Sequence, residues 1–350
     1  MLYCITFFIS LALLLATPLP ANAGKVVLTV VGDILLAGSA STTLSREGYD
    51  YPFAATAAIL RGSDIAVGNL ESPIASRGVE FTEKKYRFKA SPKAASALRR
   101  AGFSVLTLAN NHIMDFGAQG LIETLENLDK EKILYAGAGR NLVEARKPAI
   151  VEKNGQKIAF LAYSLTYPID FYAGLNQPGA APGYVHYFLE DIKKAKASTD
   201  YVVISFHWGV EGAVFPKSYQ VEVARRAIDA GADVVLGHHP HVLQGIERYK
   251  GRLILYSLGN YTFGSMSRNA ATSVMAKIVL DRGVREVELF PLNVMNAEVR
   301  FQPALLQGAR GKQVISRLHD LSRQWNTEIV TDGKRYFVRK EPRKTTVALR

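Results

Sequence analysis

From Lys25 onward the chain alternates between short apolar runs and amphipathic segments, and this alternation restricts the fold more than any other feature. Runs such as KVVLTVV (25–31), FSVLTLA (103–109) and DYVVISF (200–206) have the length and composition of buried strands. Between such runs lie segments with helical spacing of apolar residues, for example SPKAASALRRAG and YQVEVARRAIDAGA. Repeated strand–helix alternation is typical of an α/β fold with parallel or mixed sheets. The number of strands predicts two packed sheets flanked by helices.

Antiparallel strand pairs are predicted in three places. The segment PAIVEKNGQKIAFLAYS has Asn154-Gly155 at its centre, a dipeptide that favours a hairpin turn. SVMAKIVL and VREVELFPL have the pattern of two late antiparallel strands. In the tail, GKQVISRLHDLSRQW predicts an amphipathic helix, and TEIVTDGKRYFVRK predicts a short hairpin at Asp332-Gly333. We therefore expect a main domain over residues 24–295 and a small C-terminal extension, a helix plus a short hairpin, over 296–350.

The chain is strongly basic, with 43 basic and 31 acidic residues and a net charge of +12. From Arg310 onward, basic residues outnumber acidic ones by eleven to four. One interpretation of this tail is a solvated face on the C-terminal extension. The other is a docking patch for an anionic polymer or an envelope surface, because basic patches attract polyanions. We expect no nucleic-acid partner.

The first 23 residues predict a signal peptide rather than a part of the fold. Their apolar core, residues 7–16, is followed by two prolines and by Ala21-Asn22-Ala23, the small-x-small pattern of a signal peptidase site. No basic residue precedes the core, so an uncleaved anchor is the alternative, although the apolar run is short for a membrane span. Cys4 is the only cysteine, so cleavage would leave a mature chain without disulfides. Export without disulfides fits a protein of the bacterial periplasm or cell envelope.

Polar side chains follow many of the predicted strands at the point where each strand ends. In open α/β sheets, ligand sites form beyond the carboxyl ends of the strands. Five of the seven histidines lie at such ends, which a random distribution would not produce. The polar residues at predicted strand ends are Asp33, Asn69, Glu71, Asn110, Asn111, His112, Asp115, His207, His238, His239, His241 and Asn260.

Carboxylate, amide and imidazole groups together suit a divalent first-row metal such as Mn, Fe or Zn. We therefore expect one or two such ions. A bound ion lowers the pKa of its water toward ~7 and supplies hydroxide at neutral pH. Two ions about 3.5–4 Å apart can hold both the attacking and the leaving oxygen of a phosphoryl group. Such a pair needs one bridging carboxylate, for which Glu71 is the candidate.

Each of these residues has a simpler interpretation when it is taken alone. Asp33 can cap the following turn, because Asp often bonds to nearby backbone groups. Asn69 can be a turn residue, and Asn111 can adopt the left-handed turn conformation that Asn tolerates. A single His207 is more often structural than a metal ligand. The metal interpretation is favoured because buried polar groups need partners, and these groups partner one another through a cation.

The segment GHHPH (237–241) contains three histidines within five positions. Pro240 restricts the local backbone, so His239 and His241, which flank it, can face one centre. His238 would then point elsewhere, and we predict that it lies either behind the ligands or at the surface.

Seven short motifs occur in the order seen in a known family: VGDILLAG, AVGNLESPI, YRFKASP, TLANNHIMDFG, FHWGVE, GHHPHVLQGIE and YSLGNYTF. On these motifs the chain resembles the poly-gamma-glutamate capsule biosynthesis (CapA) family over roughly residues 26–290. That family is similar to the metallo-dependent phosphatases. The resemblance therefore implies a four-layer α/β sandwich with a metal centre, and poly-gamma-glutamate as the polymer.

The resemblance also implies roles for individual residues. The implied metal ligands are Asp33, Glu71 as the bridging carboxylate, Asn111, His207, His239 and His241. The implied catalytic residues are His112 as general acid, with Asn110 and Asp115; we assign substrate contacts to Asn69, Lys89 and Asn260. Two positions depart from the phosphatase pattern: Leu35 stands where a histidine ligand is usual, and Asn69-Leu70-Glu71 replaces a Gly-Asp-x-x-Asp element. One of two ions would therefore be weakly held or absent.

Three functional hypotheses follow. The first is an exported metal-dependent hydrolase or transferase of capsule or cell-envelope polymer production that acts on a phosphoester or an acyl bond. It would take an anionic polymer or a phosphoester as substrate, beside an envelope- or membrane-associated polymer synthase. The second is a non-catalytic protein that binds or escorts the polymer and keeps a relic metal site. The third is a periplasmic phosphodiesterase for a nucleotide or a phospholipid.

Overall fold

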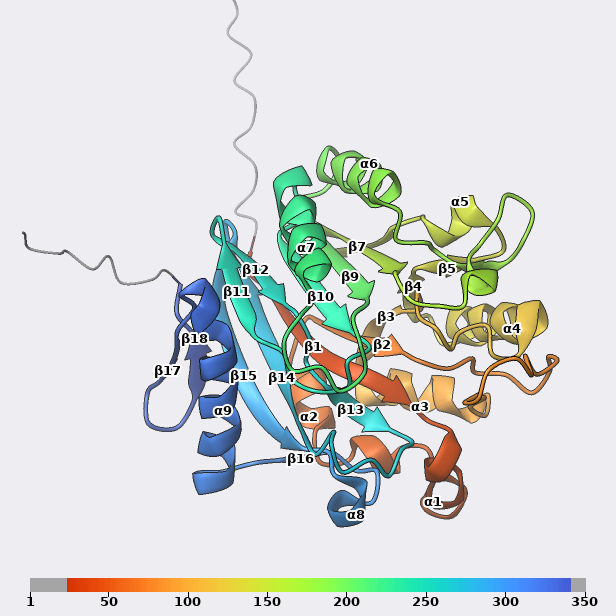
Figure 1. Cartoon of the computed structure of the whole chain (residues 1–350), viewed down its shortest axis with the longest axis horizontal. Coiled ribbons are helices and arrows are strands. Elements are labelled where there is room, and N and C mark those ends of the chain that lie inside the picture. Colours follow the sequence, from red (N-terminus) through yellow and green to blue (C-terminus); the bar gives the residue numbers. More distant parts are fainter. Residues whose placement is uncertain (1–23, 341–350) are drawn as a thin grey trace, which may run out of the picture.

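Two β-sheets packed face to face, with helices on both outer sides, make up the computed structural model of the chain, which describes residues 24–340 (Figure 1). The predicted signal peptide, 1–23, and residues 341–350 of the predicted extension lie outside the described residues. The larger sheet has ten strands in the order β17-β18-β15-β14-β1-β2-β3-β4, with β13 beside β1 and β16 beside β15. These strands are β1 (Val26–Leu35), β2 (Ile65–Leu70), β3 (Phe103–Thr107), β4 (Leu134–Ala136), β13 (Asn260–Phe263), β14 (Thr272–Leu280), β15 (Val284–Asn293), β16 (Ala304–Leu305), β17 (Ile329–Thr331) and β18 (Tyr336–Val338).

The smaller sheet has six strands in the order β11-β12-β10-β9-β7-β6. Its four central strands run parallel, and each edge strand runs antiparallel to its neighbour. The hairpin predicted at Asn154-Gly155 joins β6 to β7. The strands are β6 (Ala149–Lys153), β7 (Gln156–Ser164), β9 (Tyr201–His207), β10 (Val234–His238), β11 (Ile246–Tyr249) and β12 (Arg252–Leu255), and a separate short pair consists of β5 (Ala138–Gly139) and β8 (Gly179–Ala180).

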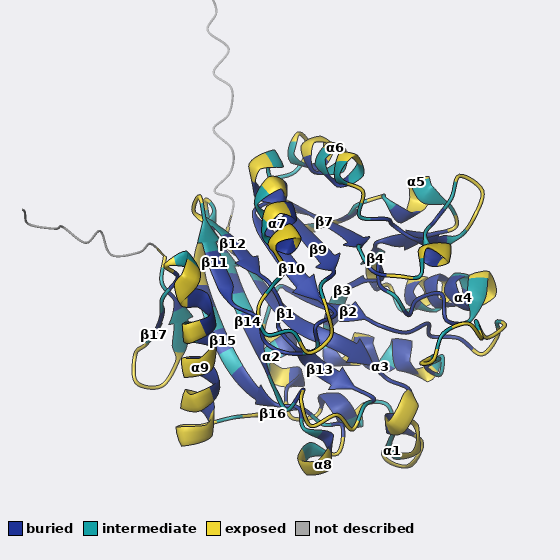
Figure 2. Cartoon of the chain, in the orientation of Figure 1, coloured by how far each residue is buried: buried dark blue, intermediate teal, exposed yellow. Residues whose placement is uncertain are grey.

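Helices cover the outer faces of both sheets. Helices α2, α3 and α4 contact the larger sheet, and α6 and α7 contact the smaller one. Figure 2 shows that these helices bury the side turned toward a sheet and expose the other. The helices are α1 (Ser41–Glu47), α2 (Ala57–Arg61), α3 (Lys93–Ala101), α4 (Gly117–Lys130), α5 (Leu142–Ala145), α6 (Val185–Lys196), α7 (Ser218–Ala230), α8 (Asn296–Val299) and α9 (Gly308–Ser322).

Three hydrophobic clusters separate four layers, and strand β9 illustrates how the sequence produces them. Alternate side chains of a strand point to opposite faces. Val202 and Ile204 pack against α6 and α7 in one cluster, whereas Tyr201 and Val203 pack toward β1 and β14 in the cluster between the sheets. The third cluster joins the outer face of the larger sheet to α1–α4. The predicted α/β sandwich of two mixed sheets flanked by helices is therefore confirmed.

Two segments differ from the elements predicted for them. The segment predicted as one helix, PFAATAAILRG, begins with a 3-10 turn, and α2 starts only at Ala57. Thr56 breaks the helix, because its hydroxyl bonds with the Tyr261 hydroxyl at 2.5 Å and it has a non-helical backbone. The segment predicted as one strand, RLILYSLGN, contributes to both sheets: the chain leaves the smaller sheet after β12 and enters the larger one at β13. Gly259 permits this crossing with a left-handed φ of 75°.

The C-terminal segment continues the larger sheet instead of standing apart from it. Strand β18 pairs antiparallel with β15, and β17 pairs with β18 at the sheet edge. Helix α9 contributes Val314, Ile315 and Leu318 to the cluster between the sheets. The predicted helix and hairpin are present, and they share the hydrophobic core of the main domain. Among residues 24–340, no helix combines the length and apolar character needed to cross a membrane.

Candidate metal centre

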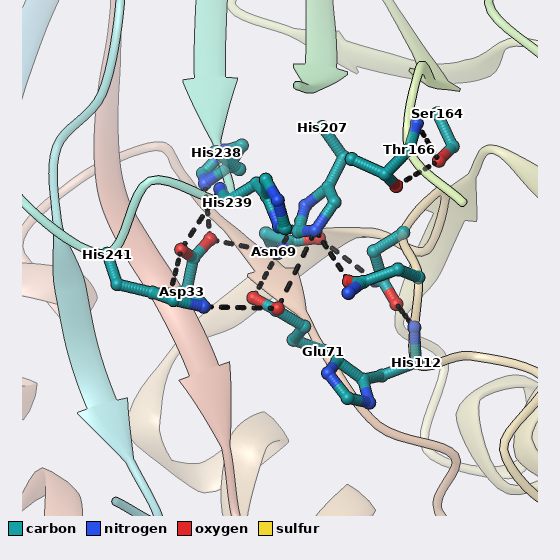
Figure 3. Close-up of polar contacts among 12 residues, drawn as sticks. Asp33, Asn69, Glu71, His112, Ser164, Thr166, His207, His238, His239 and His241 are labelled. Atoms are coloured by element: carbon teal, nitrogen blue, oxygen red, sulfur yellow. Dashed lines mark hydrogen bonds and ion pairs between the residues drawn. The ribbon is translucent and has the colours of Figure 1, made fainter. Parts of the chain in front are cut away.

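The ends of strands from both sheets meet at one edge of the sandwich (Figure 3). In the larger sheet, the register pairs Asp33 on β1 with Asn69 on β2. In the smaller sheet, His207 on β9 pairs with His238 on β10. The neighbours of β1 change at this point, from β14 along its first half to β13 from Asp33 onward. Gly32 allows the close approach, because a Cβ there would lie 1.8 Å from the carbonyl oxygen of Gly259.

Glu71 lies at the middle of this edge with an unsatisfied carboxylate. The residue is fully buried, and its Oε1 has no hydrogen-bond partner among the described residues. Oε1 lies 3.6 Å from His207 Nε2 and 3.7 Å from His241 Nε2, while Oε2 accepts a hydrogen bond from Asn69 at 3.2 Å. Burial, followed by the charge of Asp33, raises the pKa of Glu71 well above its ordinary range. A buried carboxylate oxygen without a partner is costly, and a cation bound by Oε1 and the neighbouring imidazoles would satisfy it.

One group of donors gathers Glu71, His207 and His239. One nitrogen or oxygen from each lies within 4.8 Å of the others. Asn111 Oδ1 lies 2.9 Å from His207 Nε2, so its amide belongs to the same group. Burial and then the charge of a neighbouring histidine hold the pKa of His207 well below its usual value and lower that of His239 to about 3. Both rings are therefore neutral, the form that binds metals.

A second group consists of Asp33, Glu71 and His241, again with one donor atom each within 4.8 Å. His241 Nδ1 lies 3.1 Å from Asp33 Oδ2 and 3.0 Å from Asn260 Oδ1, which leaves Nε2 toward Glu71. Burial lowers the pKa of His241, but the charges of Glu71 and Asp33 outweigh it and raise the value to about 9. A proton on His241 thus balances carboxylates that a cation would otherwise balance.

The turn that carries the two outer histidines has an unusual backbone. His239 and His241 have φ values of 95° and 59°, which non-glycine residues rarely adopt. Such conformations concentrate at functional sites, where the surrounding structure holds them. His239 Nδ1 is also buried without a hydrogen-bond partner. Two orphaned buried atoms, on Glu71 and His239, together with imidazole, amide and carboxylate donors, fit a divalent first-row ion.

Behind the ligands, three residues hold them in place. His238 is 2% exposed and donates from Nδ1 to Asp33 Oδ1 at 2.9 Å, so it lies behind Asp33 and not at the surface. Asn69 is 1% exposed and donates to the same oxygen at 2.9 Å. Asn260 contacts His241. The structure thus places Asn69 and Asn260, which we assigned to substrate contacts, against metal-ligand candidates.

His112 and Asp115 form a hydrogen-bonded pair beside this centre. His112 Nδ1 donates to Asp115 Oδ2 at 2.6 Å, and Asp115 also accepts from Phe88 N at 2.9 Å and from Lys84 Nζ at 2.6 Å. Asn110 holds the backbone of His112, because its Oδ1 accepts a hydrogen bond from the backbone N–H of His112 at 3.1 Å. Burial lowers the pKa of His112 despite the bond with Asp115, so the ring is neutral at pH 7.

Lys84 is the lysine that reaches the centre, whereas the sequence-predicted Lys89 does not. Lys84 Nζ contacts the carbonyl oxygen of Asn111 as well as Asp115. Lys89 Nζ instead donates to the carbonyl oxygen of Ser76 at 3.3 Å and lies over the Phe116 ring. Both lysines belong to an irregular loop after β2, where no periodic pattern indicates which side chain turns inward.

A pocket of about 560 Å³ opens beside the centre. His112, His241 and Asn260 form its wall toward the centre. Its other lining includes the aromatic rings of Tyr86, Phe88 and Phe263 and the carboxylate of Glu211, and none of its lining residues within 24–340 is a lysine or an arginine. The pocket therefore has room for a substrate group, and its positive charge would come from the centre itself.

Comparison with known proteins places the chain in a family. The family model described as "Bacterial capsule synthesis protein PGA_cap" matches residues 27–265, which include every candidate site residue from Asp33 to Asn260. The chain belongs to the PGA_cap family. The predicted relationship to the capsule biosynthesis proteins is thus confirmed.

Two PGA_cap relatives are similar over most of their length. The PGA biosynthesis protein CapA of Bacillus subtilis is 34% identical over 311 residues, covering 88% of this chain and 80% of the relative. The capsule biosynthesis protein CapA of Bacillus anthracis is 33% identical over 278 residues, covering 77% of this chain and 68% of the relative.

Solved structures show more remote likeness. The NAD nucleotidase of Haemophilus influenzae matches with a TM-score of 0.48 and 14% identity, over 85% of this chain and 63% of that one. The calcineurin-like phosphoesterase YfkN of Bacillus subtilis matches with a TM-score of 0.46 and 15% identity, over 85% of this chain and 97% of that one.

Proposed function

We propose that this PGA_cap protein is an exported, metal-dependent hydrolase or transferase of capsule polymer production. The observation that carries the proposal is the buried, unpaired Oε1 of Glu71, which lies between the Nε2 atoms of His207 and His241. An oxygen in this position is what a bridging ligand requires. The names of the relatives connect the family to capsule and PGA biosynthesis.

The candidate residues would serve as metal ligands and as a proton-transfer group. Glu71, His207, His239 and Asn111 would hold one ion, and His241 with Glu71 would hold a second. Bound ions would supply hydroxide at neutral pH and polarise the bond under attack. Asp115 fixes a proton on His112 Nδ1, so Nε2 is the nitrogen that exchanges a proton with a substrate in the pocket. Because the ring is neutral, protonation of a leaving group requires that His112 first takes up a proton in the complex.

The proposed substrate is an anionic polymer or a phosphoester. A phosphoryl or carboxylate group would meet positive charge at the ions and at Lys84, which lies beside His112. The aromatic rings that line the pocket would contact an uncharged part of the substrate. A polymer synthase of the envelope is the proposed partner, and export is proposed from the sequence of residues 1–23.

The metal content of the purified chain from Gly24 onward, made without a histidine tag, tests the proposal. Elemental mass spectrometry should find one or two equivalents of Mn, Fe or Zn. His239→Ala should lower that content, while Glu222→Gln, an exposed carboxylate on α7, should leave it unchanged. Metal-loaded protein is then screened on phosphodiesters and gamma-glutamyl peptides.

A chain that binds none of these ions, even after each is added back, would contradict the proposal. The second candidate, a non-catalytic protein that binds the polymer, would then apply. Leu35 favours this candidate, because this fully buried leucine offers no donor atom at the position where a histidine ligand is usual. Bound metal without turnover on any substrate would also support it.

A further inference from the structure

Glu211 presents an unpartnered carboxylate to the outer side of the candidate metal centre. Its side chain is exposed, lines the pocket beside His241, and has no hydrogen-bond or ion-pair partner within residues 24–340. Donor atoms of Glu211, His239 and His241 lie within 4.8 Å of one another. Glu211 does not directly follow the end of β9 at His207, so the pattern of polar strand ends does not indicate it.

The backbone around Glu211 is fixed although its side chain is exposed. The N–H of Ala213 donates to the carbonyl oxygen of Val210 at 3.1 Å, and Gly212 has a φ of 75°, which closes a turn with Glu211 at its tip. The N–H of Gly212 also donates to the carbonyl oxygen of Pro240 at 2.8 Å. This last bond ties the turn to the two histidines that flank Pro240.

Asp33 lies on the other side of His241 and accepts four hydrogen bonds. Oδ1 accepts hydrogen bonds from Asn69 and His238, both at 2.9 Å. Oδ2 accepts from the His239 N–H at 3.3 Å and from His241 Nδ1 at 3.1 Å. A carboxylate has about four acceptor sites, and these four donors occupy them. Asp33 therefore orients His241, as a carboxylate behind a metal-bound histidine does.

We propose that Glu211 is a ligand of the second cation beside His241, whose donor atom lies within 4.8 Å of a Glu211 oxygen, while Asp33 accepts a hydrogen bond from the other ring nitrogen of His241. Glu211 and His241 both line the pocket, so an ion held by them would be reachable from the pocket. The inference rests on the proposed metal centre, since it adds a ligand to one of its two positions.

Mn²⁺ binding to the tag-free chain tests the inference without any substrate. Equilibrium dialysis over a series of free Mn²⁺ concentrations gives the number of ions and their affinities, and electron paramagnetic resonance shows whether two Mn²⁺ ions are close enough to couple. Glu211→Gln should retain one ion at the wild-type affinity, weaken the other at least about tenfold, and abolish the coupled signal. Glu222→Gln is the matched control and should behave as wild type. Because Glu211 is exposed, the metal-free variant should unfold at the same temperature as the metal-free wild type.

Three other outcomes would each overturn the inference. Two ions of unchanged affinity in Glu211→Gln would show that Glu211 contacts a cationic group of the substrate or nothing at all. A single ion in both wild type and variant would show that the second position does not exist. No ion in the wild type would refute the proposed metal centre as well, which separates the two failures.

Discussion

Replacing Glu71 with glutamine should stabilise the metal-free protein. Glutamine keeps the length of the side chain and an oxygen for the hydrogen bond from Asn69, but it removes a charge that is buried beside Asp33. Leaving a buried polar group unpaired costs ~1–3 kcal/mol. We therefore expect Glu71→Gln to raise the free energy of unfolding by ~1–3 kcal/mol in EDTA at pH 8.

The stabilisation by Glu71→Gln should depend on pH in one direction. The folded-state pKa of Glu71 lies well above its ordinary value of 4.5, because of burial and then Asp33. Below pH 4.5 the carboxyl is protonated in both the folded and the unfolded protein. As the pH rises above 4.5 toward the raised folded-state pKa, only the unfolded state ionises, and the wild type loses stability. Glu71→Gln lacks this loss, so its advantage should be small at pH 4 and grow toward pH 8.

Excess metal should make the wild type more stable than Glu71→Gln. A ligand that binds only the folded state adds RT ln(1 + [L]/Kd), about 2.7 kcal/mol at a hundred times Kd. The wild type should gain this stabilisation in excess Mn²⁺, and Glu71→Gln should gain much less. Urea unfolding followed by circular dichroism, with and without EDTA, measures both effects. A variant that is less stable than wild type in EDTA, or equally stabilised by Mn²⁺, would refute the reasoning about Glu71.

Three further predictions concern residues around the centre. Glu123 accepts four hydrogen bonds from the loop after β2, and these bonds outweigh burial and lower its pKa to about 2. Glu123→Gln should therefore lower the free energy of unfolding by about 2–3 kcal/mol in a urea titration. The wild type should also lose stability as the pH falls from 4.5 toward 2, and a variant with the same acid slope would exclude Glu123 as its source. His238→Ala should weaken Mn²⁺ binding by ~10–100-fold in equilibrium dialysis, because Asp33 loses a donor at 2.9 Å; unchanged affinity would mean that this donor is dispensable. Asp115→Asn should leave the metal content intact but shift the His112 proton away from Nδ1, and ¹⁵N NMR of the ring would refute the assignment if it found no change.

The sequence predicted the layers and the edge that carries the site, because both follow from local periodicity. Alternation along a strand such as β9 assigns its side chains to two faces. Parallel strands of one sheet end at one edge, which gathers Asp33 and Glu71 in the larger sheet and His207 and the GHHPH histidines in the smaller one. That the two edges lie together depends on how one sheet packs on the other, which no local pattern indicates.

What the sequence did not indicate depends on contacts between distant segments. The crossing between sheets at Gly259 is invisible in the continuous apolar pattern of RLILYSLGN. The irregular loop that carries Lys84 and the turn that carries Glu211 have no periodicity from which side-chain direction could be derived. The direction of His238 toward Asp33 is set by the pairing of β9 with β10 and not by its own neighbours in the sequence.

The position of β1 in the larger sheet also governs how the chain can be made. The first strand of the fold lies between β2 and β14, and β14 ends only at Leu280. During synthesis, the edge of β1 that pairs with β14 therefore stays unpaired until most of the chain has been made. An unpaired strand edge is a template for aggregation, and pairing over so long a sequence separation is slow. The same arrangement that positions Asp33 at the centre thus leaves the nascent chain with an open strand edge until β14 is made.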